Sequence, residues 1–208
     1  RGVTPALCGS NKAEENGNGS LMRILPAAFV LYGKYGKNVA GSSRAMQEIH
    51  RISGLTHRHP LAQSACGIYI SIACHVLDGE TIPMSVYDGV EKALEWYGRH
   101  SRFLPIVDTW KNLAFVAQRD EDSIRSGGYV VETLETALWC LLRTKNYRDC
   151  VLRCVNMGYD ADSTAAVAGG LAGLYYGYDA IPQEWLSLLA GKEIIEDCVQ
   201  GLERYCTE

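Results

Sequence analysis

The sequence predicts an all-α fold, organised as one compact domain of many helices. Apolar residues recur at three- and four-residue spacing along most of the 208 residues. Gly, Pro or a short polar cap marks most of the predicted helix ends. No stretch shows the sustained two-residue alternation of a half-buried strand, and no Asn-Gly or Asp-Gly hairpin joins two such runs.

The first half of the chain should form helices at residues 20–30, 38–52, 60–79 and 83–100. In the first of these, Pro26 falls early enough to be tolerated near the opening turns. Pro60 and Pro83 open the third and fourth, and Gly79 follows the end of the third. The third helix should bury the face formed by Ala62, Cys66, Tyr69, Ala73 and Val76.

The second half is less regular up to residue 129 and strongly periodic beyond it. A short helix is expected around residues 110–117, and Ser126-Gly127-Gly128 is a turn. From Glu132 to Leu142 the apolar spacing is that of one helix face. Asn146 should cap the next helix, which Gly158 ends. The remaining helices are expected at residues 163–176, 182–189 and 192–205.

The net charge and the length of the apolar runs argue against nucleic acid and membranes as partners. The net charge is −4, so no basic field is available for binding nucleic acid. No apolar run approaches the roughly 20 residues that a membrane-spanning helix needs. Of the eight cysteines, Cys66, Cys74, Cys140 and Cys154 lie in apolar helical patterns, which predicts reduced, buried thiols in a cytoplasmic protein.

The segment Gly158-Tyr159-Asp160-Ala161-Asp162-Ser163-Thr164 lies at a junction between two predicted helices. If it is a turn before a helix that starts at Ser163, the two carboxylates and the serine hydroxyl can face one point. Three oxygen donors suit Mg²⁺, Mn²⁺ or Ca²⁺, but such ions prefer at least six ligands. The alternative is plain helix capping, for which Asp, Ser and Thr are the usual residues.

The helix after this turn consists mostly of Ala and Gly between Ala165 and Gly173. Glycine weakens a helix interior by about 1 kcal/mol relative to alanine, so the composition needs a compensating reason. Close approach of another helix is the expected one. This helix should therefore be central and should hold the acidic turn in place.

A second polar segment, Gly17-Asn18-Gly19-Ser20-Leu21-Met22-Arg23, opens a predicted helix. Glycines at a helix start can present backbone N–H groups to an anion, and Arg23 adds positive charge. The alternative is a capped helix with a surface arginine. His57 precedes another helix, where a histidine is commonly a cap or a surface residue.

These segments, together with Thr56-His57 and Gly127-Gly128-Tyr129-Val130, resemble the motifs of the ADP-ribosylglycohydrolases in the right order. The similarity is greatest to the bacterial branch that contains dinitrogenase-reductase-activating glycohydrolase. The resemblance implies an all-α fold with a two-metal site for Mg²⁺ or Mn²⁺ in an ADP-ribose cleft. It makes Asp160 and Asp162 catalytic and, with Ser163, metal-ligating, and it implies substrate contacts at Gly17, Asn18, Gly19, Ser20, Met22, His57, Gly128 and Tyr129.

The family also carries an N-terminal Thr-Asp-Asp motif that completes the metal cluster, and this sequence does not contain it. We therefore expect a missing segment before Arg1 and an inactive fragment without it. The expected substrate is an ADP-ribosylated protein, with the N-glycosidic bond of ADP-ribosyl-arginine as the bond cleaved. Alternatives are an O-linked ADP-ribosyl bond, non-catalytic ADP-ribose binding and a structural role. The sequence gives no prediction of oligomeric state.

Overall fold

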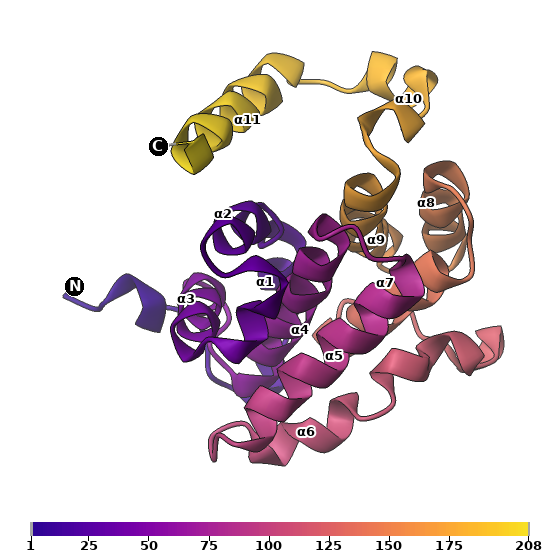
Figure 1. Cartoon of the computed structure of the whole chain (residues 1–208). Coiled ribbons are helices and arrows are strands. Elements are labelled where there is room, and N and C mark those ends of the chain that lie inside the picture. Colours follow the sequence, from indigo (N-terminus) through magenta and orange to yellow (C-terminus); the bar gives the residue numbers. More distant parts are fainter. Residues whose placement is uncertain (1, 208) are drawn as a thin grey trace.

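The computed structural model describes residues 2–207, and within them every named element is a helix or a 3₁₀ helix. The all-α prediction is confirmed. The α-helices are α1 Gly19–Arg23, α2 Pro26–Tyr35, α3 Ser43–Gly54, α4 Pro60–Leu77, α5 Ile82–Gly98, α6 Leu104–Trp110, α7 Val130–Leu142, α8 Tyr147–Asn156, α9 Ala161–Tyr176, α10 Gln183–Leu188 and α11 Lys192–Thr207. Figure 1 shows their arrangement.

Two predicted helices are each divided in the structure. The helix expected at residues 20–30 is two helices, because Pro26 opens α2 instead of lying inside a longer helix. Proline has no N–H and its ring clashes with the carbonyl four residues earlier. The stretch expected at 38–52 consists of a 3₁₀ helix, η3 Gly36–Gly41, followed by α3. Ser42 caps α3, since its Oγ accepts a hydrogen bond of 3.3 Å from the Ala45 N–H.

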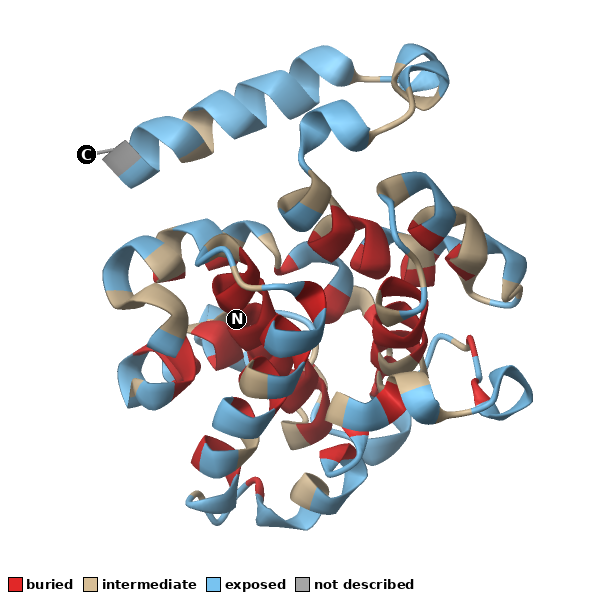
Figure 2. Cartoon of the chain, turned by 45° about the vertical axis from the view of Figure 1, so that its right-hand side comes forward, coloured by how far each residue is buried: buried red, intermediate tan, exposed pale blue. Residues whose placement is uncertain are grey.

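Helix α4 forms the centre of the molecule. It packs against α1, α2, α3, α5, α7 and α9, as Figures 1 and 2 show. By length and composition alone it could cross a membrane, but 89% of it is buried inside the protein. The face predicted from Ala62 to Val76 is buried, and so are nearly all other residues of this helix. Burial on all sides explains why α4 is apolar around its whole circumference.

The Ala/Gly composition of α9 reflects close packing, as predicted. The helix contacts α1, α4, α7 and α8. Tyr69 of α4 donates a hydrogen bond of 2.8 Å to the Val167 carbonyl. A Cβ at Gly170 would lie 2.6 Å from Leu25 Cδ2 and 2.8 Å from the Tyr69 hydroxyl. Any larger side chain would collide there, so glycine allows α4 and α1 to approach the helix.

The C-terminal helices α10 and α11 lie outside this core, and α11 runs back to contact α2 (Figure 1). No described residue of α11 is buried, and Ile194, Ile195 and Val199 expose apolar surface. The eight cysteines are free thiols. Five are buried, including the four predicted to be so and Cys150 of α8.

Candidate functional site

Two loops far apart in the sequence pair with each other beside the start of α1. The Asn18 N–H donates to the Gly128 carbonyl at 3.1 Å, and the Val130 N–H donates to the Asn16 carbonyl at 3.0 Å. Gly17 and Tyr129 thereby form an isolated antiparallel bridge. The polar segment before α1 and the Gly-Gly turn before α7, which the sequence singled out separately, are therefore one structural unit.

The acidic turn joins this unit through Asp160. The Asp160 N–H donates to the Ser126 carbonyl at 3.0 Å. Asn18 Nδ2 donates to Asp160 Oδ2 at 2.5 Å, and the Ser163 hydroxyl donates to Asp160 Oδ1 at 3.0 Å. The same amide nitrogen of Asn18 also donates to Thr133 Oγ1 at 2.9 Å. Both carboxylate oxygens of Asp160 thus have a fixed partner, and the carboxylate is held in one orientation.

The start of α9 differs from the expectation in its boundary. The helix begins at Ala161, so Asp162 lies in its first turn instead of in an extended segment before Ser163. Asp160 occupies the N-cap position, yet its side chain makes no capping hydrogen bond to the backbone. Simple capping therefore does not explain this carboxylate. The chain reaches the position through Gly158 (φ +73°) and Tyr159 (φ +55°), a left-handed turn.

The donor set at this turn fits a hard divalent cation. Asp160 is half-buried, Asp162 is exposed, and the Ser163 hydroxyl keeps its lone pairs free because it donates its proton to Asp160. Gly128 leaves space in front of the carboxylate, since a Cβ there would lie 3.2 Å from Asp160 Oδ2. Carboxylate and hydroxyl oxygens suit Mg²⁺ or Mn²⁺. These three residues would form part of a larger ligand set.

His57 lies against the Gly17–Gly19 loop. Its Cε1 atom is 3.2 Å from the position that a Cβ on Gly19 would take. The His57 N–H donates to the Ser53 carbonyl at 2.8 Å, and the His57 Nδ1 atom is 2.8 Å from the Thr56 hydroxyl. Burial, and then the charge of Arg23, lower the pKa of His57 below its ordinary value. The imidazole is therefore neutral at neutral pH.

The other predicted contact residues differ in accessibility. Met22 and Tyr129 are about two-fifths exposed, and Gly128 is exposed. Ser20 is fully buried, and its hydroxyl accepts a hydrogen bond of 3.1 Å from Ser53 Oγ. The Ser20 side chain thus faces the core, and the residue has no exposed surface. Arg23 donates to the Thr56 hydroxyl at 2.7 Å and to the Ile52 carbonyl, and so fastens α1 to the end of α3.

Sequence reasoning missed the buried hydroxyl residues that hydrogen-bond to the loops of the site. Thr133 is fully buried and accepts from Asn18, while its own hydroxyl donates to the Gly127 carbonyl at 3.0 Å. Ser126 and Thr164 are both buried, and their hydroxyl oxygens are 3.3 Å apart. The available signal was a threonine among the buried apolar positions of α7, which needs a hydrogen-bond partner.

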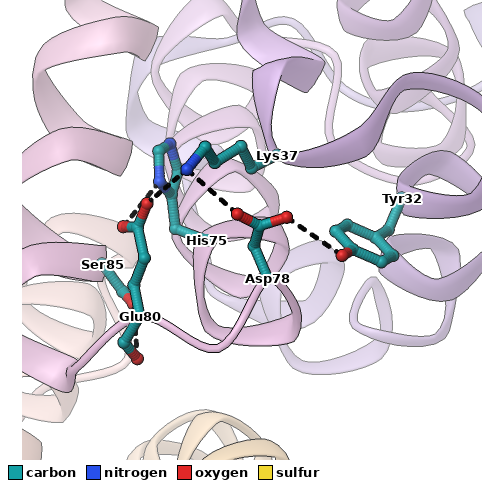
Figure 3. A network of polar contacts seen from close by, with 6 residues as sticks. All are labelled: Tyr32, Lys37, His75, Asp78, Glu80 and Ser85. Atoms are coloured by element: carbon teal, nitrogen blue, oxygen red, sulfur yellow. Dashed lines mark hydrogen bonds and ion pairs between the residues drawn. The ribbon is translucent and has the colours of Figure 1, made fainter.

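A second cluster of possible metal ligands lies elsewhere, at the C-terminal end of α4. One ligand atom each from His75, Glu80 and Asp88 lies within 4.8 Å of the others. Figure 3 shows that Lys37 enters the same network, with its Nζ 2.9 Å from Glu80 and 3.0 Å from Asp78. The Lys37 ammonium group already supplies one positive charge between Glu80 and Asp78. This cluster is therefore an ion-pair network between η3 and the α4–α5 turn, and it is distinct from the Asp160 turn.

Comparison with known proteins identifies the family of this chain. The family model described as ADP-ribosylglycohydrolase matches residues 1–208. The ADP-ribosylarginine hydrolase Tri1 of Serratia proteamaculans is 31% identical over 194 residues, which are 93% of this chain and 48% of that protein. The ADP-ribosyl-[dinitrogen reductase] glycohydrolase of Rhodospirillum rubrum is 32% identical over 173 residues, which are 83% of this chain and 50% of that protein.

A solved structure shows the same family similarity. One chain of an ADP-ribosylglycohydrolase-related protein complex aligns with a TM-score of 0.67 at 28% identity, covering 94% of this chain and 62% of that one. This chain spans about half the length of the curated relatives it matches. The full-length family match, together with the motifs that meet at Asn18 and Asp160, shows that the chain belongs to the ADP-ribosylglycohydrolase family.

Proposed function

We propose that this chain contributes the substrate loops and part of the metal site of a hydrolase that releases ADP-ribose from ADP-ribosylated arginine. The observation that carries this proposal is the hydrogen bond from Asn18 to Asp160, which joins the loop at residues 16–19 to the acidic turn. The printed names of two relatives, an ADP-ribosylarginine hydrolase and a glycohydrolase acting on ADP-ribosyl-dinitrogen reductase, support the choice of bond.

In this proposal Asp160, Asp162 and Ser163 hold Mg²⁺ or Mn²⁺ together with ligands from outside the acidic turn. A divalent ion bound there would supply positive charge that polarises ribose hydroxyls and water. Asn18 acts as a positioning residue, because its amide fixes Asp160 Oδ2 while Ser163 fixes the other oxygen. Second-shell hydrogen bonds of this kind set the direction in which a ligating carboxylate faces.

The loops around the carboxylates have separate roles in substrate binding. The half-buried Gly17 and Gly19 would face the diphosphate, where backbone N–H groups favour an anion. His57, which is neutral, would accept or donate one hydrogen bond to the nucleotide without adding charge. Gly128 and Tyr129 would border the adenosine end, since the exposed Tyr129 ring offers a surface on which a base can stack.

The reaction is a hydrolysis at C1″ of the ribose attached to arginine. Water forms the new C1″–O bond, the C1″–N bond breaks, and the guanidine leaves with a proton. The transition state develops positive charge at C1″, as in glycoside hydrolysis generally. Carboxylate charge held near that carbon stabilises it.

The proposal is tested by release of ADP-ribose from ADP-ribosyl-arginine by the protein. Asp160→Ala combined with Asp162→Ala should lower turnover at least about a hundredfold, with circular dichroism unchanged. Glu91→Ala, which removes an exposed carboxylate on α5, serves as the matched control. Unchanged turnover in the double variant contradicts the proposal. ADP-ribose binding without turnover in the unmodified protein would assign a binding function instead.

A further inference from the structure

A pocket of about 360 Å³ lies away from the acidic turn. The N-terminal segment, α3, the start of α4 and the turn before α6 form its walls, and none of the residues assigned to the candidate site lines it. In Figure 1 this is the region where the N-terminal segment lies beside α3. The volume falls at the small end of the range of ligand pockets. Its polar lining consists chiefly of Arg51, Arg58, Arg102, Gln47, Gln63 and Asn11.

Positive charge in this pocket has no carboxylate to balance it. The lining contains three arginines and no Asp or Glu. Among the side chains described, residues 2–206, no carboxylate lies within ion-pair distance of Arg51, Arg58 or Arg102. Arg102 donates to the backbone carbonyl of Arg58 at 2.8 Å, which holds the Arg102 guanidinium near Arg58. An anion would relieve the resulting repulsion.

The positive charge in the pocket contributes to lowered pKa values of Arg102 and His50. Partial burial, and then the positive charge of Arg58, lower the pKa of Arg102. Burial, and then the charge of Arg102, lower the pKa of His50 to about 3. The His50 ring, which also lines the pocket, is therefore neutral and does not compete for an anion. The three guanidinium groups are the charged groups of this site.

A buried acceptor in the same wall also has no partner. Gln63 is only 3% exposed, and its Nε2 donates to the His50 carbonyl at 2.9 Å. Its Oε1 is buried and makes no hydrogen bond. An unsatisfied buried acceptor is costly and rare in native structures. Gln63 also lines the pocket, so a hydroxyl or amino donor of a ligand placed beside it would satisfy this acceptor.

We propose that this pocket binds a small phosphate ester that carries a hydroxyl group. The guanidinium forks of Arg51, Arg58 and Arg102 match the geometry of a phosphate, and Gln63 Oε1 accepts from the hydroxyl. Such an ester can be a free sugar phosphate or the phosphate end of a nucleotide. The site is independent of the proposed hydrolase activity, because it shares no lining residue with the acidic turn.

The test is calorimetric titration of this chain with ribose 5-phosphate, inorganic phosphate, AMP and ribose. Ribose 5-phosphate should bind more tightly than inorganic phosphate, and ribose should not bind. Arg102→Gln and Arg51→Gln should each weaken ribose 5-phosphate binding about tenfold or more. Arg51 makes no hydrogen bond or ion pair to another described side chain, so its replacement leaves the fold intact. Tighter binding of AMP than of ribose 5-phosphate would identify the ester as a nucleotide.

Two control variants test whether ribose 5-phosphate binds at this pocket and not at another surface arginine or at the candidate active site. Arg44→Gln, at an exposed arginine paired with Glu48 outside the pocket, should bind ribose 5-phosphate like the unmodified chain. Asp160→Ala should do the same, since it alters only the candidate active site. Absence of phosphate-ester binding, or equal loss in Arg44→Gln and Arg102→Gln, would overturn the proposal. A Gln63→Met variant that keeps its preference for ribose 5-phosphate over phosphate would overturn the role of Gln63.

Discussion

At the scale of single residues, Asp160 is oriented by hydrogen bonds that reach its two oxygens from different elements. Asn18 approaches from the loop before α1, and Ser163 approaches from the first turn of α9. Neither bond caps the helix, so the carboxylate is held by side chains and not by the α9 backbone. This arrangement keeps the charged group half-buried and pointed toward Gly128.

The space in front of Asp160 predicts the effect of Gly128→Ala. A Cβ there would meet Asp160 Oδ2 at 3.2 Å, so the carboxylate must turn away. We expect Mn²⁺ affinity to fall about tenfold, as for other changes that reorient a metal ligand. Because Gly128 is exposed, the free energy of unfolding should change by less than about 1 kcal/mol. Mn²⁺ binding can be followed by electron paramagnetic resonance.

The control for this variant is Gly33→Ala on α2, where a Cβ would meet nothing within 4 Å. It should leave Mn²⁺ affinity unchanged and stabilise the helix by about 0.5–1 kcal/mol. Equal Mn²⁺ affinity in the unmodified protein and in Gly128→Ala would argue against a metal at Asp160.

At the scale of elements, α9 connects the acidic turn to the core. Its small residues allow α4 and α1 to approach, and the Tyr69 hydroxyl fastens α4 to the Val167 carbonyl. The sequence composition predicted this packing, because glycines in a helix interior need a close neighbour. It did not predict that α9 starts at Ala161, since a boundary depends on backbone geometry at Gly158 and Tyr159.

Two glycines on this helix should respond in opposite ways to replacement by alanine. At Gly170 a Cβ would lie 2.6 Å from Leu25 and 2.8 Å from the Tyr69 hydroxyl, so Gly170→Ala should destabilise the protein by about 1–3 kcal/mol. At Gly173 the nearest atom is 3.8 Å away, so Gly173→Ala should stabilise it by about 0.5–1 kcal/mol. Urea denaturation measures both. The same sign for both changes would contradict close packing as the reason for Gly170.

The network between η3 and the α4–α5 turn predicts a pH dependence of stability. Hydrogen bonds from Lys37 and Tyr32 lower the pKa of Asp78. Burial alone would raise the pKa of Glu80, but hydrogen bonds from Lys37 and His75 outweigh it and lower this pKa too (Figure 3). Each carboxylate therefore contributes stability that is present above its unfolded pKa of about 4 and is lost as the pH falls through the lowered value.

Replacing Lys37 with Met should consequently lower the urea midpoint at pH 7 and flatten its decline between about pH 4 and pH 2. Lys92→Met removes a lysine whose Nζ is 3.8 Å from Glu95 on the exposed side of α5, and its pH profile should follow that of the unmodified protein. If Lys37→Met and Lys92→Met gave the same profile, the network would not account for the acid sensitivity.

At the scale of the whole molecule, α4 separates two polar clusters. Its N-terminal end lies beside His57 and the candidate site, and its C-terminal end carries His75 and the Lys37 network. Eighteen helical residues extend over about 27 Å. A metal bound at the Lys37 network could therefore not replace one at Asp160. The clusters are distinct in position, and Lys37 already provides the cation of the second.

Sequence reasoning reached the fold class, most helices and each separate motif, because helical periodicity and capping are local signals. It could not show that Asn18 holds Asp160, because the two residues are 142 positions apart. Thr133 escaped notice for the same reason: its partner Asn18 is 115 positions away. The arginine pocket also depends on tertiary structure, since Arg51 lies near the end of α3, Arg58 in the loop before α4 and Arg102 in the turn before α6.

The central claim, that the Asp160 turn binds a divalent metal ion, is tested most directly by crystals of the protein grown with Mn²⁺ and ADP-ribose. Anomalous scattering of manganese locates the ion without reference to its ligands. The account predicts a peak about 2.0–2.3 Å from carboxylate oxygens of Asp160 and Asp162. A peak at the His75 cluster alone, or none while Asp160 keeps its bonds to Asn18 and Ser163, would contradict it.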